Sequence, residues 1–128
     1  MTQWSQDAVD RVFAPPLVPG DRPIDLNHLS RMTLGDPMLE CEVLRLFECQ
    51  AAMLMNRMDP EHPPHVAAAA HTLKGSAAAI GAWSVARTAS AVEAAAMSGD
   101  KSAVEGGLTG LTAAVREARS DIAAILRG

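Results

Sequence analysis

The segment from Val66 to Ile80 reads VAAAAHTLKGSAAAI, and its apolar side chains recur with the period of a helix. A stripe with spacings of four, three, four and three residues runs through Val66, Ala70, Leu73, Ala77 and Ile80. Such a stripe lies on one face of an α-helix and packs against other helices in a bundle. We expect this helix to run from about residue 64 to residue 80 and to stop at Gly81.

Capping residues and helix breakers mark further helices on both sides of this segment. Asp25, Asp36 and Asp100 are expected N-caps, and Pro37 suits the first turn of a helix. The expected helices span about residues 26–32, 37–58, 64–80, 82–97 and 101–126. Short loops between four long helices predict an all-α fold, an antiparallel up-down-up-down four-helix bundle with a short additional N-terminal helix across one end.

Apolar residues with helical spacing mark the core faces of the flanking helices. In the helix over 37–58, the expected stripe holds Val43, Phe47, Leu54 and Met58, widened by Leu39, Leu46 and Met53. In the last helix, it holds Val104, Leu108, Leu111, Val115, Ile122 and Ile125. Met53, Met55 and Met58 are interpreted as core, with an adaptable docking surface as the alternative. Gly106, Gly107 and Gly110 weaken the last helix, at roughly 1 kcal/mol each relative to alanine.

The first 24 residues differ in composition from the rest and are assigned as an arm and connector, with the bundle over residues 25–128. Trp4, Ala8 and Val12 recur at helical spacing, and Phe13 extends their apolar side. APPLVPGDRP (residues 14–23) holds four prolines and a glycine, which predicts an extended connector. We expect the arm to dock on the bundle, because exposing tryptophan and phenylalanine to water is unfavourable.

Charge and composition exclude several classes of function. The net charge is −4 and there is no basic stripe, which argues against binding to nucleic acid or to an anionic membrane. The N-terminus does not resemble a signal peptide, and we expect a cytoplasmic protein with no membrane span.

The two cysteines are not expected to form a disulfide. Cys41 and Cys49 are eight residues apart, roughly 12 Å along a helix, which is too far for a disulfide. They are expected to be reduced core thiols.

One histidine of the opening segment points away from the core stripe. At 100° per residue, His71 lies roughly 140° from the centre of the stripe, on the outer side of the helix. Its neighbours one or two turns away are small, namely Ala67, Ala68, Gly75 and Ala78, and Lys74 follows three positions on. A glycine inside a helix costs about 1 kcal/mol relative to alanine, but here it leaves clearance beside the imidazole. This pattern suits a site where another protein brings a bulky, negatively charged group onto His71.

The motif HTLKGS (residues 71–76), with Gly81 ten residues after the histidine, resembles the signature of histidine phosphotransfer (HPt) domains of two-component phosphorelays. The likeness extends to Val92-Glu93, where the family often has Leu-Glu, and covers about residues 25–126. The resemblance implies that neutral His71 attacks the aspartyl phosphate of a receiver domain and passes the phosphoryl group to a second receiver.

The resemblance also implies roles for the neighbouring residues. Lys74 would stabilise charge on the phosphoryl oxygens. Glu93 or a water would hold the other ring nitrogen of His71, with an ion pair to Arg87 or a solvated carboxylate as the alternative. Ser76 is either a hydrogen-bond donor to the phosphoryl group or a helix residue without a role in the site.

The implied partners are response-regulator receiver domains and a hybrid histidine kinase. No cofactor is expected in this chain, since the Mg²⁺ of the reaction should belong to the partner receiver. The sequence has no ATP-binding motif, so we expect no kinase activity of its own. His62 and His65 lie among prolines, where a metal site is possible in principle, but a loop of solvated histidines is expected.

Two other classes of function remain open at this point. One is the dimerising phosphoacceptor domain of a sensor kinase, and the other is a non-catalytic helical scaffold in which His71 never reacts. The kinase domains usually have an acidic residue directly after their histidine and dimerise through a two-helix hairpin. Here Thr72 follows the histidine, and four long helices close a bundle within one chain, so a monomer is expected.

Overall fold

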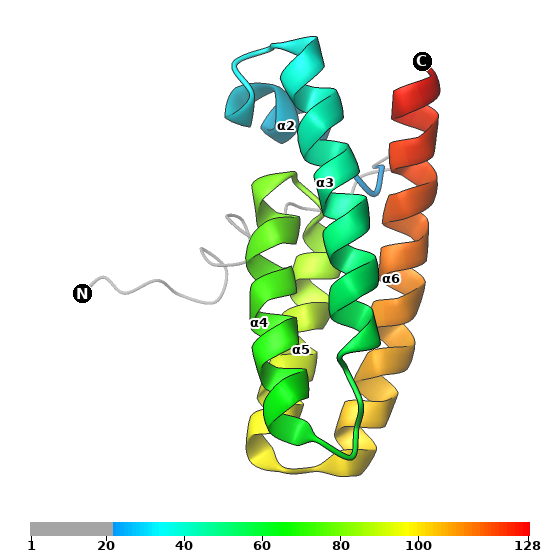
Figure 1. Ribbon diagram of the computed structural model, residues 1–128. Coiled ribbons are helices and arrows are strands. Elements are labelled where there is room, and N and C mark those ends of the chain that lie inside the picture. The colour runs from blue at the N-terminus through cyan, green and yellow to red at the C-terminus, as the bar shows by residue number, and fades with distance from the viewer. Residues whose placement is uncertain (1–21) are drawn as a thin grey trace, which may run out of the picture.

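The computed structural model describes residues 22–128, and this part of the chain contains helices and no strand. The helices are α2 (Leu26–Met32), α3 (Pro37–Asn56), α4 (Pro63–Ala79), α5 (Trp83–Ser98) and α6 (Lys101–Arg127). The four long helices run up and down in alternation, and α2 lies at the end of the bundle where α4 meets α5 (Figure 1). Each long helix packs against two others, in the cyclic order α3, α4, α5, α6. The predicted four-helix bundle with a short leading helix is confirmed.

The predicted N-caps are confirmed by hydrogen bonds. The carboxylate of Asp25 accepts from the backbone N–H of His28, and that of Asp100 accepts from the N–H of Ala103. Asp36 accepts two backbone N–H groups at the start of α3, with Pro37 in the first turn. Each cap satisfies N–H groups that have no partner inside the helix, which is why these aspartates start helices where they do.

Gly81 closes the α4–α5 turn in a way that no other residue can. Its φ of 78° lies in the left-handed region, and a Cβ at this position would stand 2.9 Å from the Cβ of Asp25. The backbone N–H of Asp25 donates to the Gly81 carbonyl at 3.0 Å, and Trp83 Nε1 donates to Asp25 Oδ2 at 2.9 Å. The start of α2 is therefore fastened to the turn that follows α4.

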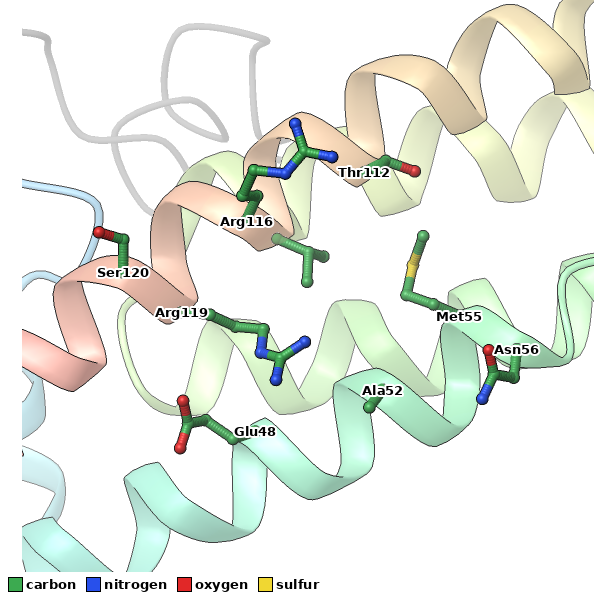
Figure 2. A pocket seen from close by; sticks show the side chains of 9 residues that line it. Glu48, Ala52, Met55, Asn56, Thr112, Arg116, Arg119 and Ser120 are labelled. Atoms are coloured by element: carbon green, nitrogen blue, oxygen red, sulfur yellow. The ribbon is translucent and has the colours of Figure 1, made fainter.

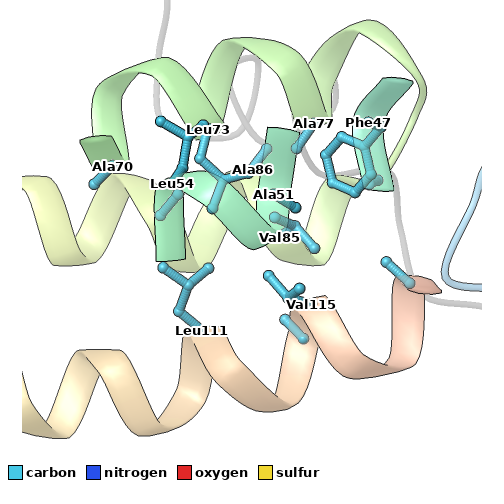
Figure 3. Close-up of a cluster of buried hydrophobic side chains, with 14 of the residues drawn as sticks. Phe47, Ala51, Leu54, Ala70, Leu73, Ala77, Val85, Ala86, Leu111 and Val115 are labelled. Carbon is cyan, nitrogen blue, oxygen red and sulfur yellow. The ribbon is translucent and has the colours of Figure 1, made fainter. Parts of the chain in front are cut away.

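The core lies between the four long helices, and Figure 3 shows side chains from all of them meeting there. All five stripe residues of α4 are buried, as predicted: Val66, Ala70, Leu73, Ala77 and Ile80. From α3, buried side chains come from Leu44, Phe47, Ala51 and Leu54. In α6, Val104, Leu111, Val115 and Ile122 are buried, while Leu108 and Ile125 pack against the core from its margin. Burial of the α4 stripe leaves the opposite side of that helix facing outward.

The predicted widening of the α3 stripe is wrong. Leu39, Leu46 and Met53 are exposed, and Leu46 retains 65% of its accessible surface. These three residues are seven positions apart, so they share one face of α3, about 120° around the helix from the core residues. We call this set the apolar strip. Of the methionines with two interpretations, Met58 is buried, Met55 is half-buried and Met53 is exposed.

The prediction of two core thiols is also wrong. Cys41 is half-buried and Cys49 is exposed, and both are free. Buried and exposed residues alternate along α3 around both cysteines. An apolar segment by itself therefore does not show whether a small side chain in it points to the core or to the surface.

One of the three glycines near the start of α6 has a packing role. A Cβ on Gly107 would stand 2.9 Å from Cγ2 of Val92, so α5 and α6 approach each other closely at this position. Gly106 and Gly110 have open space around a hypothetical Cβ, at least with respect to residues 22–128. The close contact at Gly107 offsets part of the helix-propensity cost of glycine.

The expected docking of the N-terminal arm concerns residues that lie outside the described part of the chain. The described part begins at Arg22, whose Nε donates to both carboxylate oxygens of Asp121 at 3.2 Å. The backbone N–H of Ile24 donates to the same carboxylate at 3.0 Å, and the Ile24 side chain is fully buried. Among the described helices, none combines the length and the apolar character needed to span a bilayer.

Candidate functional site

His71 lies in the middle of α4, on the side that faces away from the core, as predicted. Its side chain retains 68% of its accessible surface. The Nδ1 atom of the ring is 2.9 Å from Oε2 of Glu93, which comes from the adjacent helix α5. The imidazole is thus held from one edge while the rest of the ring remains open to solvent.

Glu93 joins His71 to Lys74. Its second carboxylate oxygen, Oε1, accepts a hydrogen bond from Nζ of Lys74 at 3.0 Å. Glu93 is the least exposed of the three, with 18% of its side-chain surface accessible, against 37% for Lys74. Of the alternatives that the sequence left open for Glu93, the structure shows contact with His71 and Lys74 rather than an ion pair with Arg87.

The charge state of Glu93 determines which ring nitrogen of His71 carries the proton. The hydrogen bond from Lys74, and to a lesser degree that from His71, holds the pKa of the Glu93 carboxyl below its ordinary value of 4.5, although desolvation opposes this shift. Near pH 7 the carboxylate is ionised and can only accept hydrogen bonds. The proton of a neutral His71 is therefore assigned to Nδ1, and Nε2 keeps its lone pair.

Only small side chains surround the imidazole on the outer side of α4, as the sequence predicted. A Cβ built on Gly75 meets no heavy atom of the described residues within 4 Å, beyond its neighbours in the helix. Ala68 is exposed, and Ala67 and Ala78 are half-buried. A bulky group can therefore approach the ring from outside without meeting a large side chain on α4.

Ser76 is turned toward α3 rather than toward the imidazole. Its hydroxyl donates to Oε1 of Gln50 at 2.7 Å. Sequence reasoning did not identify Gln50, because a single polar residue on an amphipathic helix carries no distinguishing signal. Gln50 lies between Leu46 and Met53 of the apolar strip, so its contact with Ser76 places the strip beside the outward side of α4.

The histidines predicted to lie in a loop are arranged differently. His65 is inside α4, and its ring stacks on that of His62 with centroids 5.4 Å apart. Nδ1 of His62 lies 3.2 Å from Oδ2 of Asp59. Within residues 22–128, no group of three or more histidine, cysteine or acidic side chains is placed to hold a metal ion.

Comparison with protein families identifies the domain. The family model described as "Hpt domain" matches residues 42–124, which include most of α3, all of α4 and α5, and most of α6. Neither the comparison with curated proteins nor that with solved structures gave a match. The matched range contains His71, Lys74 and Glu93 and spans more than half of the 128 residues. The chain therefore belongs to the Hpt domain family, whose domains perform histidine phosphotransfer in phosphorelays.

Proposed function

We propose that His71 accepts a phosphoryl group from the aspartyl phosphate of one receiver domain and passes it to the aspartate of another. The observation that carries this proposal is the hydrogen bond between Nδ1 of His71 and Glu93. It leaves Nε2 as an unprotonated nitrogen on an exposed side chain, which is what a nucleophile requires.

The chemical step follows from this arrangement. The lone pair of Nε2 attacks the phosphorus of the aspartyl phosphate in line with the bond to be broken. The N–P bond forms, the P–O bond breaks, and its electron pair leaves with the aspartate carboxylate of the receiver. The imidazole ring gains positive charge in this step, and ionised Glu93 stabilises that charge through the proton on Nδ1. Transfer to a second receiver is the same step in reverse.

Lys74 supplies positive charge next to the reacting group. A phosphoryl group on His71 brings up to two negative charges to a surface where Lys74 is one helical turn away. In the free protein its ammonium contacts Glu93 at 3.0 Å, so it is already held close to the imidazole. When the phosphoryl group arrives, its oxygens take up charge-assisted hydrogen bonds from the same ammonium.

The receiver docks on the surface formed by the small residues of α4 and the apolar strip of α3. Gly75 and Ala68 leave room for the phosphorylated aspartate, while Leu46 and Met53 offer apolar area beside it. Exposed apolar residues that share one face are typical of protein–protein contact sites. The strip thus accounts for large apolar side chains that the bundle itself does not bury.

Phosphotransfer profiling tests the proposal directly. The purified protein is incubated with each available phosphorylated receiver, and the label is followed on wild type, His71→Gln and His65→Gln. His65 is the matched control, because it is an exposed histidine on the same helix. Label is expected on wild type and His65→Gln, in a form that is labile in acid and stable in base. Full labelling of His71→Gln would contradict the assignment.

The same preparation separates this function from that of a dimerising kinase domain. A monomer of 13.5 kDa on a sizing column is the expected result, because α3 to α6 close a bundle within one chain. A stable dimer with its histidines in a shared bundle would favour the kinase domain instead.

A further inference from the structure

Ser76 and Gln50 link α4 to α3 next to the apolar strip. The Ser76 hydroxyl donates to Oε1 of Gln50 at 2.7 Å. Around the axis of α3, Gln50 lies about 40° from Leu46 and about 60° from Met53, on the side turned toward α4. The Gln50 side chain is therefore bordered by the strip on one side and by the outer surface of α4 on the other.

Gln50 lies within the area that a receiver bound at His71 would cover. Ser76 follows His71 by five residues, which is a rise of about 7.5 Å along α4. Because α3 and α4 run in opposite directions, the level of His71 on α3 lies beyond Gln50, in the direction of Met53 (Figure 1). A receiver that reaches His71 and also packs on Leu46 therefore covers Gln50.

The amide of Gln50 has hydrogen-bond donors that the bundle does not use. A glutamine amide has one acceptor oxygen and two N–H donors, and the oxygen of Gln50 is taken by Ser76. Within residues 22–128, the amide nitrogen has no hydrogen-bond partner. In the same part of the chain, the only buried polar side-chain atom without a partner is Nε2 of His28. The amide nitrogen of half-buried Gln50 is therefore reached by solvent.

A receiver that covers this amide has to supply an acceptor in place of water. Leaving a covered N–H donor without a partner is unfavourable. The neighbouring side chains of Leu46 and Met53 are apolar and exposed. A carboxylate among them would lose its hydration to a neutral amide, which costs more than burying a backbone carbonyl. A backbone carbonyl is also present whatever the side chains of the partner, which suits a surface that two different receivers use in turn.

We propose that Gln50 donates a hydrogen bond from its amide nitrogen to a backbone carbonyl of the docked receiver. Ser76 is the positioning residue, because its hydroxyl holds the amide oxygen toward α4 and so keeps the N–H donors free for the partner. The inference rests on the proposed function and adds a recognition contact to it. Neither side chain touches the phosphoryl group, so both should affect receiver binding and leave the chemical step unchanged.

Single-turnover transfer at increasing concentrations of phosphorylated receiver tests the role of Gln50. Gln50→Met keeps the length of the side chain and removes its hydrogen bonds. The half-saturating receiver concentration should rise roughly tenfold, because the receiver carbonyl loses its donor. The rate at saturation should stay at the wild-type value. An unchanged half-saturating concentration, or a loss of transfer only in step with a lowered thermal midpoint, would overturn the proposal.

Thr112→Val is the control variant, because it removes a polar group from an exposed position away from the docking surface. Thr112 lines the groove between α3 and α6 together with Glu48 and Ala52 (Figure 2). Those two residues lie about 160° around α3 from Gln50, so the groove is on the opposite side of that helix. Thr112→Val should keep both wild-type values, and an effect as large as that of Gln50→Met would overturn the proposal.

Two further substitutions at position 50 test the direction of the hydrogen bond and the charge of the acceptor. Gln50→Glu keeps an oxygen for Ser76 and loses the N–H donors, so it should weaken receiver binding at least as much as Gln50→Met. Binding of Gln50→Glu as tight as wild type would show that the amide presents its oxygen to the receiver. Gln50→Lys should also weaken binding, because its ammonium has to be desolvated. Tighter binding of Gln50→Lys would show a carboxylate acceptor, and either of these results would overturn the proposal.

A double-mutant cycle tests Ser76 as a positioning residue. Ser76→Ala should raise the half-saturating concentration about threefold in the wild-type background and have no effect in the Gln50→Met background. Ser76→Thr keeps the hydroxyl and should bind like wild type. Equal effects of Ser76→Ala in both backgrounds would mean that Ser76 does not act through Gln50.

Failure of this inference is distinguishable from failure of the proposed function. If no phosphorylated receiver labels His71 of the wild-type protein, the proposed function is wrong. If the wild type is labelled and Gln50→Met has the same half-saturating concentration as Thr112→Val, only the role of Gln50 is wrong.

Discussion

Replacement of Gly75 tests whether this glycine provides clearance for the incoming phosphoryl group. Gly75 lies mid-helix in α4, one turn from His71, and a Cβ added there meets nothing within 4 Å among the described residues outside its own stretch of helix. Gly110 has the same open surroundings in α6, which is diagonal to α4 in the bundle. Gly75→Ala, Gly75→Gln, Gly110→Ala and Gly110→Gln therefore form a matched set.

Stability and transfer should separate in this set. Alanine is the better helix former by about 1 kcal/mol, so both Gly→Ala variants should raise the thermal midpoint by about 4 °C. At position 75, the glutamine side chain starts about 5–6 Å from the Cβ of His71 and fills the space above the ring. A displacement of about 1 Å in a reacting pair costs roughly a hundredfold in rate, so Gly75→Gln should lose at least that much transfer.

The assay is single-turnover transfer from a phosphorylated receiver, measured beside thermal unfolding for all four variants. Both Gly110 variants should transfer at the wild-type rate. Gly75→Ala should transfer more slowly than wild type while being more stable. Equal transfer rates for Gly75→Gln and Gly110→Gln, or a loss of activity only in step with unfolding, would show that the glycine does not serve clearance.

Three further predictions concern Lys74, Glu93 and Gly81. Lys74→Ala should fold normally and slow transfer roughly ten- to a hundredfold, because it removes one charge-assisted contact worth about 1.5–3 kcal/mol. An unchanged single-turnover rate would mean that Lys74 is a surface residue without a role in transfer. Because the pKa of Glu93 is lowered in the folded state, its contribution to the free energy of unfolding is present above its ordinary value of 4.5 and is lost as pH falls through the lowered pKa. NMR titration should show this pKa rising more in Lys74→Ala than in His71→Gln, and the reverse order would refute the assignment of Lys74 as the main cause. Gly81→Ala should destabilise the bundle by about 2–4 kcal/mol in denaturant unfolding, whereas Gly99→Ala, with the same φ of 78° but open surroundings, should cost only about 1 kcal/mol.

The parts of the fold that depend on local chemistry were predictable from the sequence. An aspartate before a helix caps it wherever the helix is placed, so Asp25, Asp36 and Asp100 marked three helix starts correctly. The α4 stripe was also predictable, because the large apolar side chains of that helix all lie on one face, and the rest of the helix holds small and polar residues. The outward direction of His71 followed from the same stripe.

The face of α3 was not predictable in the same way. Leu39, Leu46 and Met53 repeat with a helical period, as core residues do, and apolar side chains that serve a partner have the same pattern as side chains that serve the core. Only the packing of α3 against α4 and α6 shows which of its two apolar faces is buried.

The hydrogen-bond partners within the site could not be predicted from the sequence, for a related reason. Glu93 is 22 residues from His71, and its partner depends on how α4 and α5 are rotated against each other. The hydrogen bond from Ser76 to Gln50 depends in the same way on α3. The sequence limits such side chains to a face of a helix, whereas the interhelical packing decides which of them meet.

The close contact between Gly107 and Val92 has a consequence for how this protein can vary. Val92 is adjacent to Glu93, so the depth at which α5 sits against α6 also sets the reach of the carboxylate toward α4. A methyl group added at Gly107 would push α5 outward and shift Glu93 relative to both of its partners. We therefore expect substitutions at the contact between α5 and α6 to change the reactivity of His71, although this contact lies away from the surface on which a receiver would dock.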